Sequence, residues 1–246
     1  MDRMLYVAMS GAKQIMQAQE ANNNNLANVS TTGFRADLDQ FRAMPVFGVV
    51  YPSRVYSMSE RPGIDFTPGP IITTDNDLNV AIRGDGFIAV QGPDGNEAYT
   101  RAGDFTLGTG GVLTTGAGHY VMGNKGPISI PPYEKIEIAK DGTITIRALG
   151  QAPNAMVVLD RIKLVNPPVA QMKKGLDGLF HLQDGSDAPP DAKVTVEPRA
   201  VESSNTNPVE ALVTMINHQR QYEMQVKMMR SAEDNATTAS KLLQLQ

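Results

Sequence analysis

The uneven distribution of glycine and proline constrains the fold of this 246-residue chain more than any other feature. No proline precedes Pro45, and the only glycines before it are Gly11 and Gly33. Neither residue occurs after Pro208. Because both residues destabilise helix interiors, the two ends of the chain are free to form long helices and the middle is not. The sequence therefore predicts a helix at each end and a turn-rich region between them.

Residues 3–29 are predicted to form the first helix, because apolar side chains recur there at three- and four-residue spacing. These side chains are Met1, Leu5, Ala8, Ala12, Ile15, Leu26 and Val29. The asparagine run 22–25 is poor helix material, since its side chains compete for backbone hydrogen bonds. We therefore expect this end of the helix to need partners, and Gly33 to end it as a left-handed cap.

Residues 208–245 carry the stronger helix signal. Asn207 is suited to cap it, Pro208 to its first turn, and Glu210 completes a spacing that resembles a capping box. Its apolar stripe consists of Leu212, Met215, Tyr222, Val226, Met229, Ala236 and Leu243. Such a narrow stripe is typical of a coiled-coil seam.

Residues 46–200 are predicted to form many short strands. Four segments are rich in β-branched and aromatic residues: Leu78–Ile82, Phe87–Val90, Ile136–Ile138 and Thr143–Arg147. Turn sequences separate such segments at Pro93-Asp94-Gly95, Gly110-Gly111, Asp141-Gly142 and Asp184-Gly185. No helical pattern alternates with them, so the prediction is an all-β region, either a sandwich or an irregular barrel.

The predicted fold class is thus α+β, with terminal helices that pair as a coiled-coil-like bundle and a central all-β domain. The expected segments are 1–44, 45–202 and 203–246. One such helix pair has little core of its own and so invites neighbouring copies. The spacing of the stripes alone fits packing within the chain equally well.

Composition excludes several classes of function. The formal net charge is −4 with both signs scattered, so nucleic-acid binding has no electrostatic support. Cysteine is absent, which excludes disulfides and thiolate chemistry. No apolar run approaches the length of a membrane span, and the N-terminal residues do not form a recognisable secretory signal.

Two short motifs resemble ligand sites but fail on context. Gly84 to Ala89 reads G-D-G-F-I-A, the letters of a dinucleotide-binding turn, yet the next residues favour a strand where that motif needs a helix. Asp75-Asn76-Asp77 begins like a calcium loop, but Val80 and Gly86 occupy the positions that require Gly and Glu. Both segments are predicted to be turns beside strands.

The three histidines, His119, His181 and His218, are isolated in sequence. No paired-histidine metal spacing and no nucleophile elbow occurs. The sequence therefore predicts no catalytic residue, no metal site and no cofactor.

Motifs at the two ends resemble one family. Residues 21–35 read A-N-N-N-N-L-A-N-V-S-T-T-G-F-R, and residues 204–227 read S-N-T-N-P-V-E-A-L-V-T-M-I-N-H-Q-R-Q-Y-E-M-Q-V-K. These resemble the N- and C-terminal signatures of the flagellar rod and hook family. The central segments 77–87 and 99–105 resemble the part that its longer members share.

The resemblance implies a structural subunit of the flagellar rod, the shaft between basal body and hook, without catalysis. The opening Met1-Asp2, the segment 62–69 and Pro208-Val209-Glu210 favour a proximal rod member. The distal rod member is the alternative, but it carries a longer insertion after the Gly-Phe-Lys motif. The implied partners are other rod subunits, copies of this chain and the flagellar type III export apparatus. The implied location is the periplasmic rod, reached without a cleaved signal peptide.

The interface that the stripes and signatures predict is a set of residues from both ends of the chain. It comprises Leu5, Ala8, Ala12, Ile15, Leu26, Asn28, Gly33, Phe34, Leu212, Met215, Tyr222, Val226, Met229 and Leu243. Two other hypotheses remain at this point. An enzyme would place its site near residues 75–86 or His119, and an export chaperone or adhesin would use the β modules without needing both signatures.

Overall fold

The computed structural model describes residues 4–45, 55–152 and 155–244. Within these ranges a helix lies near each end of the chain and short strands lie between them, which confirms the predicted α+β class. The chain divides into two compact units. Unit 1 comprises Met1–Val29, Ala36–Asp65 and Thr206–Gln246, and unit 2 comprises Ser30–Arg35 and Phe66–Asn205. Each unit is thus built from segments that are far apart in sequence.

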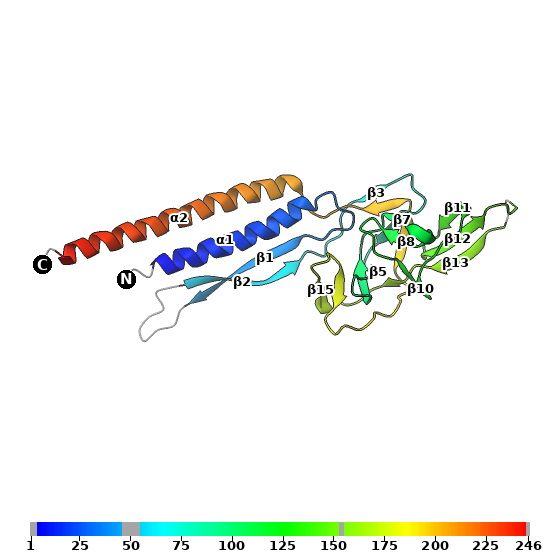
Figure 1. Ribbon diagram of the computed structural model, residues 1–246, viewed down its shortest axis with the longest axis horizontal. Helices are drawn as coiled ribbons and strands as arrows, with labels where there is room; N and C mark the ends of the chain where they lie inside the picture. Colours follow the sequence, from blue (N-terminus) through cyan, green and yellow to red (C-terminus); the bar gives the residue numbers. More distant parts are fainter. Residues whose placement is uncertain (1–3, 46–54, 153–154, 245–246) are drawn as a thin grey trace. The chain divides into compact units, whose positions relative to one another are not determined.

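Two antiparallel helices, α1 (Met4–Ala27) and α2 (Pro208–Gln244), lie side by side in unit 1 (Figure 1). The Asn22 side-chain amide donates to the Ala211 carbonyl at 2.9 Å. Farther along the pair, a Cβ added to Gly11 would lie 3.1 Å from Gln225 Cδ. α2 has 37 residues and α1 has 24. At a rise of about 1.5 Å per residue, α2 is therefore longer by about 20 Å.

The start of α2 is capped as the sequence predicts. The Asn207 side chain accepts from the Val209 N–H at 3.0 Å and from the Glu210 N–H at 3.5 Å. These bonds satisfy backbone donors that have no partner inside the helix. Glu210 lies in the first turn, where a negative charge interacts favourably with the helix dipole.

The asparagine run is helical and connects α1 to its neighbours. Besides the bond from Asn22 to α2, Asn25 forms two bonds with the backbone of Asp37. Its Nδ2 donates to the Asp37 carbonyl at 2.9 Å, and its Oδ1 accepts from the Asp37 N–H at 2.8 Å. The partners that the sequence required for this weak helical segment are therefore α2 and the strand that begins at Asp37.

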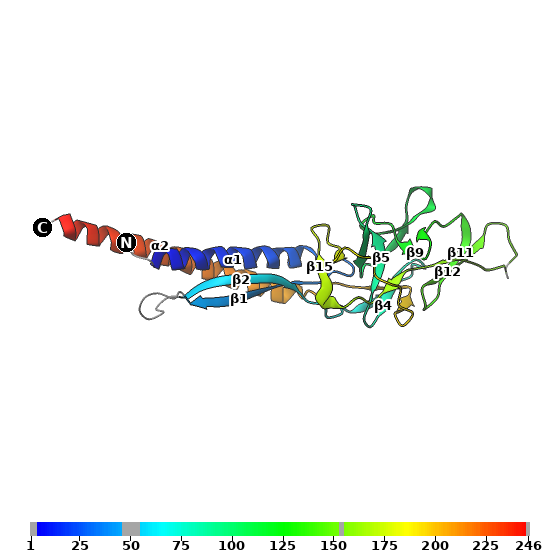
Figure 2. The same cartoon turned by 90° about the horizontal axis from the view of Figure 1, so that it is seen from below.

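That strand belongs to a long hairpin, β1 (Asp37–Pro45) and β2 (Val55–Ile64), whose register runs from Asp37 opposite Ile64 to Pro45 opposite Val55. The hairpin packs on α1, beside which it runs in Figure 2. α1 thus contacts both α2 and the hairpin.

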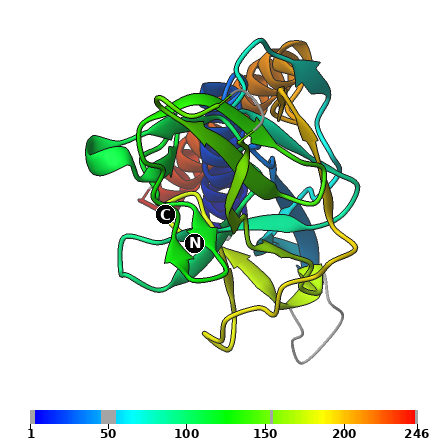
Figure 3. The same cartoon turned by 90° about the vertical axis from the view of Figure 1, so that its right-hand side faces the viewer.

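Unit 2 consists of short strands whose pairings are all antiparallel in the described residues, and which cross one another in several small sheets (Figure 3). The strands are β3 (Ile71–Thr73), β4 (Val80–Arg83), β5 (Phe87–Gln91), β6 (Glu97–Thr100), β7 (Phe105–Leu107), β8 (Leu113–Thr115), β9 (Met122–Gly123), β10 (Gly126–Pro127), β11 (Tyr133–Ile138), β12 (Thr143–Ala148), β13 (Val157–Arg161), β14 (Leu164–Val165), β15 (Met172–Lys174), β16 (Phe180–Leu182), β17 (Thr195–Pro198) and β18 (Ala200–Glu202). The largest sheet has the order β14-β5-β6-β16-β15, and a second has the order β11-β12-β13. Within the described residues no sheet closes into a barrel.

The core of unit 2 is formed by aliphatic side chains from most of these strands. Val80, Ile88, Val90 and Ile144 have no exposed surface. Beside them, the rings of Phe87 and Phe180 lie 5.5 Å apart, with Phe66 against both. Burial of such side chains is the main stabilising contribution to a domain of this kind.

The predicted turn at Asp141-Gly142 joins β11 to β12. Gly142 has a φ of +83°, which glycine adopts without steric cost. The Asp141 carboxylate accepts from the Thr143 hydroxyl at 2.7 Å and from the Thr143 N–H at 3.1 Å. These bonds, the hydroxyl bond foremost, lower the pKa of Asp141 below its usual value.

Candidate assembly interface

The side chains that are fully buried in the helix pair are small. The buried residues of the helix pair are Ala8, Ala12, Ala18 and Asn22 on α1, and Ala211 and Ala232 on α2. Side chains of this size allow two helix axes to approach closely. The larger apolar side chains of the predicted seam that the structure describes remain partly exposed.

The predicted interface residues fall into three groups. Ala8, Ala12 and Gly33 are buried; Ile15, Leu26, Asn28, Phe34, Met215, Val226 and Met229 are half-buried; Leu5, Leu212 and Tyr222 are exposed. The Leu243 side chain lies outside the described part of the structure. α1 and α2 bring together most of the set, whereas Gly33 and Phe34 belong to unit 2.

A second apolar stripe runs along α2, which sequence reasoning missed. We call Val209, Val213 and Ile216 the outer stripe; they are 68%, 53% and 50% exposed. Their four- and three-residue spacing places them on one face of the helix. Residues two apart on a helix point about 200° apart, so the buried Ala211 lies opposite Val209 and Val213. The sequence contains this stripe as a second set of apolar residues at four- and three-residue spacing, beside the set that predicted the seam.

The outer surface of α1 also carries exposed apolar side chains. Leu5, Met9 and Met16 are 41%, 55% and 52% exposed, and their spacing places them on a common face. Unit 1 thus has uncovered apolar surface on both of its helices. Exposed apolar side chains gathered on one helix face are a candidate interaction site.

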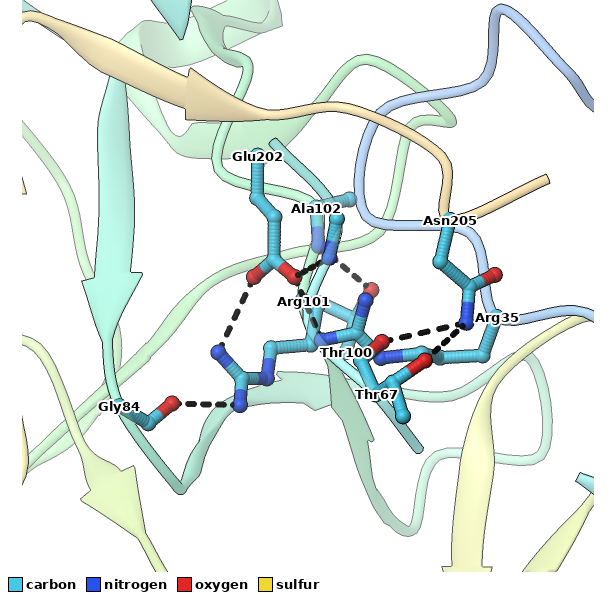
Figure 4. A network of polar contacts seen from close by, with 9 residues as sticks. Arg35, Thr67, Gly84, Thr100, Arg101, Ala102, Glu202 and Asn205 are labelled. Atoms are coloured by element: carbon cyan, nitrogen blue, oxygen red, sulfur yellow. Dashed lines mark hydrogen bonds and ion pairs between the residues drawn. The ribbon is translucent and has the colours of Figure 1, made fainter. Parts of the chain in front are cut away.

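Unit 2 contains a buried ion-pair network that joins three distant parts of the chain (Figure 4). Arg35 and Arg101 both donate to the Glu202 carboxylate, Arg35 to Oε1 and Arg101 to Oε2, the latter at 3.0 Å. The three side chains are 1%, 4% and 1% exposed, in the order Arg35, Arg101, Glu202. The Gly69 N–H donates to Glu202 Oε1 at 2.9 Å, and Arg101 also donates to the Gly84 carbonyl at 2.7 Å.

The electrostatics of this network depend on Glu202. Burial lowers the pKa of Arg101 below its usual value, and the Glu202 carboxylate opposes this shift. Arginine nevertheless stays charged in proteins, so two cations share one anion in this interior. Removing the Glu202 carboxylate would leave two buried guanidinium groups without a counter-charge, which is strongly destabilising.

Two glycines permit the close approach of backbone around the network. Gly33 has a φ of +67°, and a Cβ there would lie 2.3 Å from the Arg101 carbonyl carbon. A Cβ on Gly69 would lie 2.1 Å from the Ser203 carbonyl oxygen. Gly33 was predicted to end the first helix as a left-handed cap, and this prediction is wrong, because α1 ends at Ala27 and the Gly33 N–H donates to the Glu202 carbonyl instead of a helix carbonyl. Its positive φ and missing side chain make room for Arg101. Sequence reasoning missed Glu202, which precedes the C-terminal signature, because nothing local marks its distant partners.

The segments that resembled ligand motifs are turns. Residues 84–86 join β4 to β5, so a strand follows where a dinucleotide site requires a helix. In the segment Asp75–Asn79, the Asn76 side chain accepts from the Leu78 N–H at 3.0 Å, as in an Asx turn. Among the described residues there is no cluster of three or more metal-ligating side chains, and no helix long and apolar enough to cross a membrane.

Three family models match separate parts of the chain. Residues 5–35 match a model described as flagella basal body rod protein. Residues 81–146 match the D1 domain of flagellar hook proteins FlgE/F/G, and residues 197–242 match the C-terminal region of flagellar basal body rod FlgEFG proteins. The three models include the signature containing Arg35, the central segment containing Arg101 and the final strand containing Glu202.

Full-length relatives show which of these rod and hook proteins the chain resembles. The chain is 39% identical to the flagellar basal-body rod protein FlgF of Salmonella typhimurium and to that of Escherichia coli, in each case over 100% of both chains. It is 30% identical to the rod protein FlgG of Buchnera aphidicola, over 97% of this chain and 98% of the relative. The chain therefore belongs to the FlgF family of flagellar basal-body rod proteins. This family is structural, not enzymatic, which agrees with the sequence-based prediction.

Proposed function

We propose that this chain builds the proximal part of the flagellar rod through its helix pair and there transmits torque from the motor to the hook. The observation that carries the proposal is the outer stripe, three large apolar side chains at least half exposed on the face of α2 opposite its contact with α1. The full-length similarity to FlgF proteins supports the proximal position, and the weaker similarity to FlgG argues against the distal one.

The helix pair is suited to assembly because few of its large apolar side chains are buried within the chain. The buried side chains of the pair are small, and its large apolar side chains are mostly half-buried or exposed and thus available to neighbours. Burying one valine or isoleucine contributes roughly 1.5–3 kcal/mol, and a rod repeats the contact at every copy. Contacts between two different faces that do not close a ring generate a helical tube.

The proposed neighbours are other rod subunits, including the distal rod protein FlgG, and further copies of this chain. The proposed interface combines the outer stripe with the predicted residues that lie on α1 and α2. The resemblance to the rod and hook family also supports delivery by the flagellar export apparatus and a periplasmic position. The segments 1–44, 45–202 and 203–246 remain a proposal for the functional division of the chain.

The substitution Ile216→Asp tests the outer stripe. Because Ile216 is 50% exposed, the carboxylate should be solvated in the isolated subunit and should leave its helix content unchanged. In a rod the same carboxylate would be buried without a partner, so motility and the yield of intact basal bodies should fall to background. The matched control is Asn217→Asp, which adds the same charge at the next, exposed polar position.

Normal motility with Ile216→Asp would refute the assembly role of this face. So would an equal loss with Asn217→Asp, because charge alone would then explain the defect.

A further inference from the structure

Two passages of the chain run side by side in unit 2. One is Ser30–Arg35, which follows the N-terminal helix, and the other is residues 202–205, which precede the C-terminal helix. The Gly33 N–H donates to the Glu202 carbonyl at 2.7 Å, and the Asn205 N–H donates to the Phe34 carbonyl at 3.4 Å. The passage by which the chain first enters unit 2 and the passage by which it finally leaves it are therefore adjacent.

The Glu202 carboxylate ties both passages to the body of unit 2. It binds Arg35 from the first passage, the Gly69 N–H, and Arg101, which directly follows β6. Because the three charged side chains are at most 4% exposed, water does not replace a lost partner. Glu202 belongs to the second passage and pairs with Arg35 of the first, so loss of its carboxylate frees both passages together.

Glu202 reaches this position through a sharp bend between β17 and β18. Arg199 at the bend has a φ of +56°, and it is the only non-glycine residue with positive φ in the described part of the chain. The Arg199 N–H donates to the Asn79 carbonyl, and its carbonyl accepts from the Thr74 N–H at 2.7 Å. At this bend the chain changes its partner strand. β17, before the bend, pairs with β4, and β18, after it, pairs with β3. A non-glycine residue persists in such a conformation only where its surroundings fix it.

The first passage is also held by Lys174. The Lys174 ammonium donates to the Arg35 carbonyl at 3.0 Å and lies 4.1 Å from the centre of the Phe34 ring. Phe34 and Arg35, which belong to the family signature, therefore have their main partners inside the same unit.

We infer that Arg35, Arg101 and Glu202 form a clasp that holds the two passages as one cooperative unit. In this view Gly33, Phe34 and Arg35 are positioning residues that fix where the chain leaves and re-enters unit 2. This assignment departs from the sequence-based prediction, which placed Gly33 and Phe34 in the intermolecular interface. The clasp should already be closed in the isolated subunit, before any neighbour binds.

Hydrogen exchange of the full-length monomer tests the clasp, with the Gly33 and Asn205 amides as reporters of the two passages. Both amides should be protected in the unmodified chain. Glu202→Gln should raise both exchange rates in parallel by about tenfold or more, because local opening then exposes both passages. The β11–β13 sheet should keep its protection. The matched control is Glu197→Gln on β17, whose ion pair with Arg83 is solvent-exposed, and it should change neither rate.

A second variant covers the case in which Glu202→Gln does not fold. Lys174→Met removes the bond to the Arg35 carbonyl and the contact with Phe34 without leaving a charge of the clasp unpaired. It should raise both rates in parallel, by less than Glu202→Gln. The inference is overturned if the monomer leaves either amide unprotected, if either variant accelerates exchange at Gly33 alone, or if Glu202→Gln behaves like Glu197→Gln.

Discussion

Asn25 offers the sharpest test of how unit 1 is held together. Its side-chain amide mimics a paired strand, because it both donates to and accepts from the backbone of Asp37 at the start of β1. Replacing Asn25 with alanine removes both bonds and leaves the helix backbone intact. The hairpin should then open more often at the end where β1 begins.

The magnitude follows from two opposing contributions. A net hydrogen bond contributes about 0.5–1.5 kcal/mol, so the two bonds together stabilise the hairpin by about 1–3 kcal/mol. Alanine is the better helix former by about 0.6 kcal/mol, which offsets part of the loss. Asn24→Ala provides the matched control, because Asn24 is the preceding residue of α1 and its side chain is exposed. The control makes the same gain in helix propensity, so the difference between the two variants isolates the bonds to Asp37.

Peptide-level hydrogen exchange of the full chain measures this difference. The opening free energy of β1 should be lower in Asn25→Ala than in Asn24→Ala by about 1–3 kcal/mol. Protection in unit 2 should be the same in both variants. Equal protection of β1 in the two variants would refute the role assigned to Asn25.

Three further substitutions test other parts of the account. Gly33→Ala should cost unit 2 about 3 kcal/mol or more, since φ is +67° and the new Cβ would lie 2.3 Å from the Arg101 carbonyl carbon; a loss below about 1 kcal/mol in urea denaturation would contradict this contact. Burial raises the pKa of Asp104, so the ionised carboxylate destabilises the folded state at pH values above this raised pKa. At pH values below the pKa of Asp104 in the unfolded chain, the carboxyl is protonated in both states and this destabilisation disappears. Asp104→Asn should therefore stabilise unit 2 at neutral pH and give no gain in urea denaturation at pH about 3; a gain that persists in acid would count against this explanation. Val226→Asp places a carboxylate at a half-buried position of α2 and should lower α2 protection while that of unit 2 is kept; loss of protection throughout the chain would show that the two units do not fold separately.

Local sequence patterns predicted the elements that local chemistry determines. The helices were predicted over residues 3–29 and 208–245, and α1 and α2 span Met4–Ala27 and Pro208–Gln244. The glycine and proline distribution, the apolar spacing and the Asn207 cap act over a few residues, so one sequence suffices to read them. The turn at Asp141-Gly142 was predicted for the same reason.

Long-range partnerships were not predictable in this way. The bond from Asn25 to Asp37 and the packing of the hairpin on α1 depend on which segments meet in space. Glu202 and Arg35 are separated by 167 residues, and neither has a local pattern that indicates a buried ion pair. The asparagine run 22–25 is an example. Helix propensity predicts that this helical segment is weak, but only the structure shows that α2 and β1 stabilise it.

The outer stripe shows a different kind of omission. Val209, Val213 and Ile216 carry a regular helical spacing, but the stronger repeat beside them was assigned to the seam first. The structure covers part of that seam with α1 and leaves the outer stripe at least half exposed. A helix with two apolar faces, only one of which packs toward α1, has a face available for another molecule.

Imaging of purified basal bodies at side-chain resolution tests the central proposal most directly. We expect this chain in the proximal rod, with Val209, Val213 and Ile216 buried against helices of neighbouring subunits. The proposal would be contradicted if the chain were absent from the rod, or if it were present with these three side chains facing solvent.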